Sequence, residues 1–186
     1  MVEPAVHVRP FREPDLVLLE RDANDREFSI PFEWRGFRSF RAERRRWEED
    51  EFLGAEPYRL VVADAEDLAL GWVDWRDPRQ FGRPGLAWEL GITIAPEHRG
   101  RGVGTAAQRR LIAYLFETTP AHRLIAHTEF ENLAEQRALE KCGFRREAVH
   151  RSVGMRDGLW RDAVSYALLR TETERAPEAN DPGSAG

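Results

Sequence analysis

The feature that most constrains the fold of this chain is a strand that leads through a glycine-rich turn directly into a long helix. Alternating apolar residues predict a strand over residues 86–94, Pro96 ends it, and a helix is expected over residues 105–118. The glycines remove Cβ atoms from the turn, and the first N–H groups of the helix point outward with the positive end of its dipole. The turn therefore predicts a site for an anion such as a diphosphate. Its glycines are Gly100, Gly102 and Gly104.

The residues around these glycines narrow the kind of anion site. Arg99 and Arg101 add positive charge at its mouth, where a phosphate can be paired. The alternation differs from the six-residue fingerprint of dinucleotide-binding folds, and the Lys followed by Ser or Thr of nucleotide-hydrolysing loops is missing. The turn thus argues against a nucleotide-dependent kinase and against a dehydrogenase.

The hydrophobic patterns elsewhere predict one mixed sheet with helices on its faces. The order of elements is strand, two helices, three strands, helix, strand, helix and hairpin, which indicates an α/β fold in one domain. We expect this domain over residues 1–170 and a disordered polar tail over residues 171–186. The strands are expected over residues 6–8, 58–63, 68–75, 86–94, 123–130, 151–155 and 160–169, and the helices from residue 13 and over residues 42–52, 105–118 and 133–142.

Charge and composition exclude several classes of protein. The formal net charge of −5 is not that of a nucleic-acid-binding protein, which usually carries a basic excess. Cys142 is the only cysteine, which excludes an intramolecular disulfide and a multi-thiol metal site, and we expect no metal. The sequence has no signal-peptide pattern at its start and no apolar stretch of membrane-spanning length, so we expect a cytoplasmic protein without a membrane partner.

Three blocks of sequence resemble the GCN5-related N-acetyltransferase (GNAT) superfamily. The first is Arg99-x-x-Gly102-x-Gly104, which resembles its pyrophosphate signature. The second begins at Asn132 and ends in Gly143-Phe144 after a helix. The third, residues 160–169, is similar to the last strand of its RimJ/RimL-like branch, which Val8-Arg9-Pro10 also resembles.

The resemblance implies a fold and a donor substrate. The fold would be a central, mostly antiparallel sheet of about seven strands with helices on both faces. The donor would be acetyl-CoA or another acyl-CoA, with the pantetheine arm along the strand end, the pyrophosphate on the glycine turn and Asn132 on the pantetheine region. Gly143-Phe144 would close the helix and fill the core. The implied donor-binding residues are Ile92, Thr93, Ile94, Arg99, Gly100, Arg101, Gly102, Val103, Gly104, Thr105 and Asn132.

The general acid of this family is missing from its usual places. In many relatives a Tyr seven residues after the Asn protonates the departing thiolate, and here Leu139 stands there. The RimJ/RimL-like branch often has a Ser three residues after the Asn, and here that residue is Glu135. Tyr166, Ser165, Cys142 or a bound water remain as substitutes, and the sequence does not choose among them.

Three residues compete for the role of the general base that takes the proton of the attacking amine. His127 has an imidazole whose ordinary pKa suits proton transfer at neutral pH, and Glu129 lies two residues further on the same strand face. Glu89 lies on the neighbouring strand, where the RimJ/RimL-like branch often has an acidic residue acting through water. For each one, an ordinary structural hydrogen bond is the competing interpretation. Of the remaining histidines, His7 and His150 are expected to be peripheral, while His98 is expected in a loop near the phosphates and His122 in a turn.

The acceptor is the least specified part of the prediction. The aromatic residues Phe32, Trp34 and Phe37 are candidates for its binding wall, although core packing would explain them as well. The resemblance implies transfer to a primary amine of a small molecule or of a peptide N-terminus, and a homodimer is possible. The competing hypothesis from another class is a non-catalytic acyl-CoA-binding sensor or scaffold, since Leu139 and Glu135 replace the familiar acids.

Overall fold

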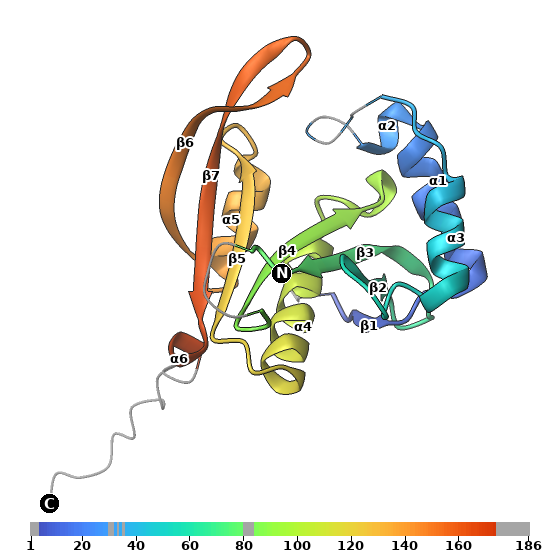
Figure 1. Cartoon of the computed structure of the whole chain (residues 1–186), viewed down its shortest axis with the longest axis horizontal. Coiled ribbons are helices and arrows are strands. Elements are labelled where there is room, and N and C mark those ends of the chain that lie inside the picture. Colours follow the sequence, from blue (N-terminus) through green and yellow to red (C-terminus); the bar gives the residue numbers. More distant parts are fainter. Residues whose placement is uncertain (1–3, 30–31, 33, 35, 80–83, 174–186) are drawn as a thin grey trace, which may run out of the picture.

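A seven-stranded sheet in the order β1-β2-β3-β4-β5-β7-β6 forms the centre of the molecule (Figure 1). The structure is a computed structural model, and it describes residues 4–29, 32, 34, 36–79 and 84–173. All neighbouring strands are antiparallel except β4 and β5, which are parallel. The strands are β1 His7–Arg9, β2 Tyr58–Ala63, β3 Ala69–Arg76, β4 Ala87–Ile94, β5 Arg123–Glu129, β6 Arg145–Arg156 and β7 Leu159–Leu169.

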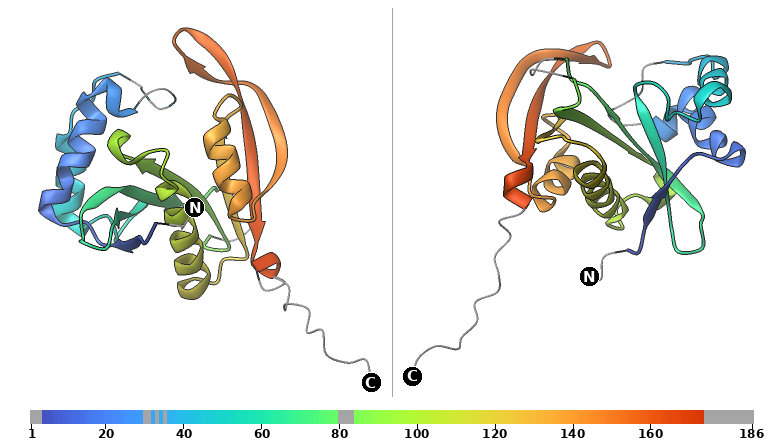
Figure 2. Two further views of the ribbon diagram at one scale, coloured as in Figure 1. Left: turned by 180° about the vertical axis from the view of Figure 1, so that it is seen from behind. Right: turned by 60° about the horizontal axis from the view of Figure 1, so that its bottom comes forward.

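Helices cover both faces of the sheet (Figure 2). The larger core joins the sheet to α4 and α5, and a second core joins its opposite face to α1 and α2. We call these faces the α4 face and the α1 face. The helices are α1 Leu16–Asn24, α2 Arg26–Ser29, α3 Arg41–Asp50, α4 Val103–Thr118, α5 Leu133–Lys141 and α6 Arg170–Thr173, with 3₁₀ turns at Glu13–Asp15 and Pro96–His98. None of the helices in the described part of the chain is long and apolar enough to cross a membrane.

The alternation of side chains along each strand decides which residues reach which face. Leu124 and Ala126 of β5 pack in the core beneath α4, so His127 points to the α1 face. Trp88 of β4 also lies in the α4 core, and its neighbour Glu89 therefore points to the α1 face. The candidate bases from the two strands thus lie on one side of the sheet.

The parallel ladder between β4 and β5 is short, and its end positions the candidate site. The pairing runs from Ala87 opposite Arg123 to Leu90 opposite Ala126 and does not continue to the later residues of either strand. Residues 91–94 of β4 still pair with β3, so β4 separates from β5 while it remains part of the sheet. The opening between the two strands lies next to the glycine turn, because only the 3₁₀ turn Pro96–His98 separates that turn from the end of β4.

The predicted fold class is confirmed, including the largely antiparallel sheet and the helices on both faces. The expected strand over residues 151–155 is longer, because β6 begins at Arg145. Its side chains are mostly polar and exposed at the edge of the sheet, so residues 145–150 lack the apolar alternation that marks a strand. The short helices α2 and α6 were not expected. Residues 174–186, which hold most of the expected tail, lie outside the described residues.

The end of α5 has the structure that the sequence predicts. Gly143 has φ +91°, in the left-handed region, and closes the helix. Phe144 follows with its side chain 3% exposed in the core, and its backbone N–H donates to the carbonyl oxygen of Leu139 at 3.0 Å. This cap turns the chain from α5 into the edge strand β6.

Gly71 of β3 permits the close approach of β4 at the opening. A Cβ atom at this position would lie 2.1 Å from the carbonyl oxygen of Thr93, a backbone atom that cannot move aside alone. We predict that Gly71→Ala lowers the free energy of unfolding by about 1–3 kcal/mol, measured by urea denaturation. Gly154→Ala is the control, since a Cβ there meets no atom within 4 Å and is expected to change stability by less than about 0.5 kcal/mol. Equal stability of the two variants would contradict the assignment.

Candidate active site

A cavity of about 550 Å³ lies between the end of β4, the glycine turn and the first turns of α5. Most of the residues predicted to bind the donor line it, together with Phe32 from the segment after α2. The predicted donor-binding residues in its wall are Ile92, Thr93, Ile94, Arg99, Gly100, Gly102, Gly104, Thr105 and Asn132. One ligand in this cavity can therefore contact the edge of β4, the glycine turn and the helix α5.

The glycine turn has the backbone that an anion cradle needs. Gly100 and Gly102 have φ of +73° and +84°, in the left-handed region that favours glycine. A Cβ at Gly100 would meet no atom within 4 Å, so its side faces open space. The helix α4 begins at Val103, and the N–H groups of its first turn have no partner within the helix. The residues present therefore fit a diphosphate.

Three of the predicted residues have a structural position that the sequence did not specify. The Arg99 guanidinium donates from Nε to the carbonyl oxygen of Ile94 at 2.7 Å and also to that of Phe28, so it ties the turn to α2. Arg101 is exposed and does not line the cavity. Val103 lies in the core beneath α4, where its side chain is 5% exposed. Val103 can therefore contribute only its backbone N–H group to the donor site, because its side chain is buried.

The opposite wall of the cavity is one face of α5. Asn132 caps this helix, since its Oδ1 accepts a hydrogen bond from the backbone N–H of Glu135 at 3.2 Å. Two exposed cations, Arg137 and Lys141, stand on the same wall and can meet phosphate groups. Sequence reasoning missed this wall, although the spacing 134, 137, 138 and 141 is that of one helical face. The lining residues from α5 are Ala134, Glu135, Arg137, Ala138 and Lys141.

Glu135 is the carboxyl group among the residues that line this cavity. Burial raises the pKa of this carboxyl to about 7, against the hydrogen bond from Gln108, which favours the carboxylate. Gln108 Nε2 donates to Glu135 Oε1 at 2.5 Å, and the Gln108 side chain is only 3% exposed. The site thus holds a carboxyl group that is protonated in a large fraction of molecules near neutral pH.

The substitute acids considered from the sequence lie elsewhere. The Tyr166 hydroxyl donates to Glu140 Oε1 at 3.0 Å, and the side chain is fully buried in the α4 core. Cys142 Sγ donates to the carbonyl oxygen of Thr105 at 3.5 Å and to Gln108 Oε1 at 3.6 Å. Ser165 lies on the α1 face. None of these three side chains lines the donor cavity in the part of the chain that the structure describes.

Two of the three candidate bases are held in ion pairs. Glu89 Oε1 accepts from Arg76 at 2.5 Å across the β3–β4 pair. Both oxygens of Glu129 accept from Arg156 Nε, at 3.2 and 2.9 Å. Because this ion pair uses both oxygens of Glu129, that carboxylate is the poorest candidate for binding an amine.

His127 stands where β4 and β5 separate, one residue past the last ladder pair. It is exposed on the α1 face, and its ring centroid lies 6.0 Å from that of His150. His150 Nε2 in turn lies 3.1 Å from Ser165 Oγ. His150 is exposed on the edge strand β6, as expected of a peripheral residue, but its ring reaches across β7 to His127, a contact that the sequence did not predict. No periodic pattern over residues 145–150 could have indicated this.

Asp74 is a further carboxylate on this face that sequence reasoning missed. It pairs with Gly91 across β3 and β4, and a Cβ at Gly91 would lie 2.6 Å from Asp74 Oδ2. The carboxylate therefore occupies the space that a side chain at position 91 would fill. Burial raises the pKa of Asp74, while the nearby Arg59 acts in the opposite direction. Asp74, Glu89 and His127 thus surround the strand opening from the α1 face.

The three aromatic candidates for the acceptor wall divide into two groups. Phe32 lines the donor cavity, and the guanidinium carbon of Arg156 lies 5.3 Å from the centre of its ring. This contact joins the segment after α2 to the β6–β7 hairpin across the site. Trp34 and Phe37 pack edge to face at 5.2 Å, outside the cavity, and Phe37 is 80% exposed.

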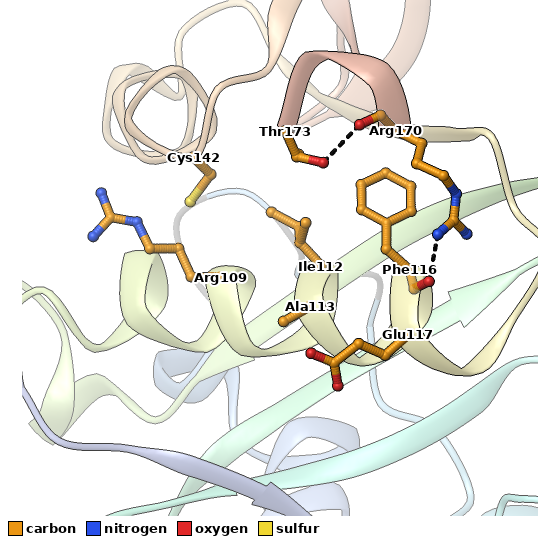
Figure 3. A pocket seen from close by; sticks show the side chains of 8 residues that line it. All are labelled: Arg109, Ile112, Ala113, Phe116, Glu117, Cys142, Arg170 and Thr173. Atoms are coloured by element: carbon orange, nitrogen blue, oxygen red, sulfur yellow. Dashed lines mark hydrogen bonds between the residues drawn. The ribbon is translucent and has the colours of Figure 1, made fainter. Parts of the chain in front are cut away.

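A second hollow of about 380 Å³ lies along the other side of α4, between this helix and α6 (Figure 3). It is lined by residues of the middle and end of α4, whereas the donor cavity adjoins its beginning. Arg170 closes it by donating to the carbonyl oxygen of Phe116, and Thr173 Oγ1 donates to the carbonyl oxygen of Arg170 at 2.7 Å. The first contact attaches α6 to α4, the second lies within α6, and no candidate site residue takes part in either.

Comparison with known families agrees with this arrangement. Residues 6–145 match the family model described as an acetyltransferase (GNAT) domain. Because the match covers most of the chain, the chain belongs to the GNAT family of acetyltransferases.

Curated relatives and solved structures extend the comparison. The chain is 28% identical over 118 residues to the uncharacterized N-acetyltransferase YnaD of Bacillus subtilis, which covers 63% of this chain and 66% of YnaD. It is 33% identical over 114 residues to spermidine N(1)-acetyltransferase of Vibrio cholerae, covering 61% of this chain and 64% of the relative. The matched part thus spans slightly less than two thirds of the length of these relatives. The crystal structure of spermidine N-acetyltransferase from Vibrio cholerae in complex with CoA and spermine superposes with a TM-score of 0.77 at 24% identity, covering 90% of this chain and 96% of that one.

The raised pKa of Glu135 predicts how the free energy of unfolding depends on pH. Between pH of about 4.5, the ordinary pKa of Glu, and about 7, the folded chain keeps a proton that the unfolded chain releases. This carboxyl therefore makes the free energy of unfolding fall as pH rises through that window and adds no slope above it. Glu135→Gln removes this contribution, so the stability of the variant relative to the native chain is expected to rise from pH 4.5 to 7 and then stay constant.

Urea denaturation at a series of pH values measures this difference. Glu117→Gln, an exposed carboxyl on the far side of α4, is the matched control and is expected to give a difference that does not change in the window. A Glu135→Gln difference that is also independent of pH would contradict the raised pKa.

Proposed function

We propose that this chain catalyses the transfer of an acyl group from acyl-CoA to the primary amine of a small molecule. The observation that carries the proposal is the cavity of about 550 Å³, which joins the strand end, the glycine turn and the α5 wall in a chain of the GNAT family. We further propose acetyl as the acyl group, in line with the acetyltransferase family model.

The donor's parts match the parts of the cavity. The glycine turn and the beginning of α4 would hold the pyrophosphate with backbone N–H groups. Arg137 and Lys141 would meet further phosphate charge at the mouth. The amide groups of the pantetheine arm would lie along residues 92–94, where β4 has separated from β5 and its backbone edge can accept another strand-like chain. The arm then brings the thioester to the opening.

The acceptor would approach the same opening from the α1 face. Asp74, Glu89 and His127 surround it there, and they can receive an ammonium group and take its proton. The neutral amine that results is the nucleophile. Charge complementarity thus supports an amine as the acceptor, and the contact of Phe32 with Arg156 supports a compact one.

The named acceptors of several relatives support the same class. Besides spermidine, they include L-methionine sulfoximine for a Salmonella typhimurium enzyme that is 26% identical over 125 residues. The RimJ/RimL-like branch remains our proposal, supported by 36% identity over 86 residues to YdaF of Bacillus subtilis, a putative ribosomal N-acetyltransferase. A peptide N-terminus as acceptor, a homodimer and a cytoplasmic location stay predictions.

The proposal is tested by release of free CoA thiol from acetyl-CoA in the presence of polyamines, amino acids, aminoglycosides and short peptides. We predict turnover with at least one small amine and CoA binding that is measurable by calorimetry. Gly104→Leu is expected to weaken CoA binding about tenfold or more, because the new side chain enters the cavity beside Ile92 and Ile94.

Ala113→Leu is the matched control, since it adds the same side chain to an exposed position of the same helix that lines the other hollow. It is expected to keep the affinity of the native chain. If the chain binds CoA but acylates none of the amine classes, the enzyme assignment is wrong and a sensor or scaffold is favoured. If Gly104→Leu binds CoA with the affinity of the native chain, the donor binds elsewhere.

The assignment of the base is tested by Glu89→Gln and His127→Gln, measured with the amine that the panel identifies. We predict that at least one variant lowers kcat by about 10²-fold while the KM for acetyl-CoA stays within about threefold, because general-base catalysis contributes about that factor. Glu129→Gln is the comparison, since the ion pair with Arg156 already uses both oxygens of Glu129. Unchanged kcat in both Glu89→Gln and His127→Gln would show that neither is the base.

A further inference from the structure

The residue that protonates the leaving group is not assigned by any of the comparisons. Leu139 cannot supply a proton and is 1% exposed in the core. Tyr166 donates its hydroxyl hydrogen to Glu140 and Cys142 its thiol hydrogen to the carbonyl oxygen of Thr105, and neither side chain lines the donor cavity in the described part of the chain. A side chain that protonates the departing sulfur therefore has to lie in the cavity wall.

The titratable side chains in that wall are Arg99, Glu135, Arg137 and Lys141. Arg99 is tied to two backbone carbonyls, and Arg137 and Lys141 are exposed cationic side chains on the outer surface of α5. Glu135 differs from them in kind, because a carboxyl group can be a neutral acid that becomes a charged base after giving up its proton. It also lies in the first turn of α5, directly after the Asn132 cap, rather than at the mouth.

The hydrogen bonds around Glu135 leave one of its oxygens available. Gln108 Nε2 donates to Oε1, and the Gln108 carboxamide is fixed in this orientation because its own oxygen accepts from Cys142 Sγ. Among the described residues, the Glu135 carboxyl accepts a hydrogen bond only from Gln108, at Oε1. Oε2 is therefore the oxygen that can carry a proton into the cavity. A carboxyl group whose carbonyl oxygen accepts from an amide is arranged to donate from its hydroxyl.

We propose that Glu135 is the general acid that protonates the sulfur of the departing CoA, an inference that rests on the proposed acyltransferase function. The attacking amine nitrogen forms its bond to the acyl carbon and loses a proton to the base on the α1 face. The carbon–sulfur bond then breaks, and its electron pair goes to sulfur. The proton of Glu135 Oε2 bonds to that sulfur, which leaves CoA thiol and the Glu135 carboxylate, and the carboxylate regains its proton from water.

The protonation state of Glu135 suits this role. Its pKa of about 7 keeps the acid present near neutral pH and still lets the proton leave readily. A donor in the cavity displaces water from beside the carboxyl, and this further burial favours its neutral form. The acid is therefore best protonated when the thioester is in place.

The first experiment titrates the thiol of bound CoA by the ultraviolet absorbance of its thiolate, without any acceptor. In the native chain the Glu135 carboxylate beside the sulfur disfavours the thiolate, so the thiol pKa is expected to be higher, by about 1 unit, than in Glu135→Gln. Glu117→Gln is the control and should match the native chain. Equal thiol pKa values in the native chain and Glu135→Gln would overturn the proposal, because the carboxyl then does not act on the sulfur.

The second experiment measures the pH dependence of turnover. Glu135→Gln is expected to lower kcat by about 10²-fold with little change in the KM for acetyl-CoA, and to remove the fall of kcat as pH rises above about 7. Glu135→Asp, which keeps the carboxyl but withdraws it, is expected to retain that fall and to have an intermediate kcat. A raised KM with unchanged kcat in Glu135→Gln would overturn the proposal by assigning the carboxyl to donor binding.

The two experiments separate the two levels of inference. If the native chain binds CoA and acylates no amine, the proposed function fails, while the thiol titration still decides whether Glu135 acts on the sulfur. If the native chain turns over and Glu135→Gln is unaffected in both measurements, only the assignment of the acid fails.

Discussion

The candidate site depends on the point at which two parallel strands stop pairing. A parallel ladder normally satisfies the backbone groups of both strands along their length. Here the ladder between β4 and β5 ends at Leu90 and Ala126, while β4 continues along β3 to Ile94. The facing edge is thereby left for a ligand that can hydrogen-bond like a strand. The glycine turn and α4 follow at once, so the same opening adjoins an anion cradle.

The sequence was most informative where local chemistry alone decides the structure. The glycine turn and Gly143 each need a left-handed backbone, and each has it at the expected position. Asn132, which the sequence analysis assigned only to donor binding, also caps α5. The strands β2 to β5 bury one or both faces and show this in their apolar patterns. Most of the predicted donor-binding residues line the cavity for the same reason, since they are consecutive along one strand and one turn.

The sequence was least informative where the site is built from residues far apart in the chain. His150 reaches His127 only because the edge strand β6 pairs beyond β7. Asp74 faces the opening because Gly91 of the neighbouring strand leaves room for its carboxylate. The pKa of Glu135 depends on burial and on Gln108 from a different helix, which the spacing between positions 108 and 135 does not reveal. Position alone suggested that the usual acid is missing at Glu135, whereas the structure shows a partly buried carboxyl group with a raised pKa.

The two faces of the strand opening have a consequence for the order of binding. The beginning of α4 and the wall of α5 border the opening on one side, and Asp74, Glu89 and His127 approach it from the α1 face. Ser29 of α2 lines the cavity as well, so the cavity is open toward that face. Under the proposed function, an acceptor that approaches from the α1 face would meet a donor already bound in the cavity, so both substrates would be present together. Such an arrangement favours direct transfer within a ternary complex, without a covalent acyl-enzyme intermediate. The kinetics would then be sequential, and the two substrates would meet at the opening between β4 and β5.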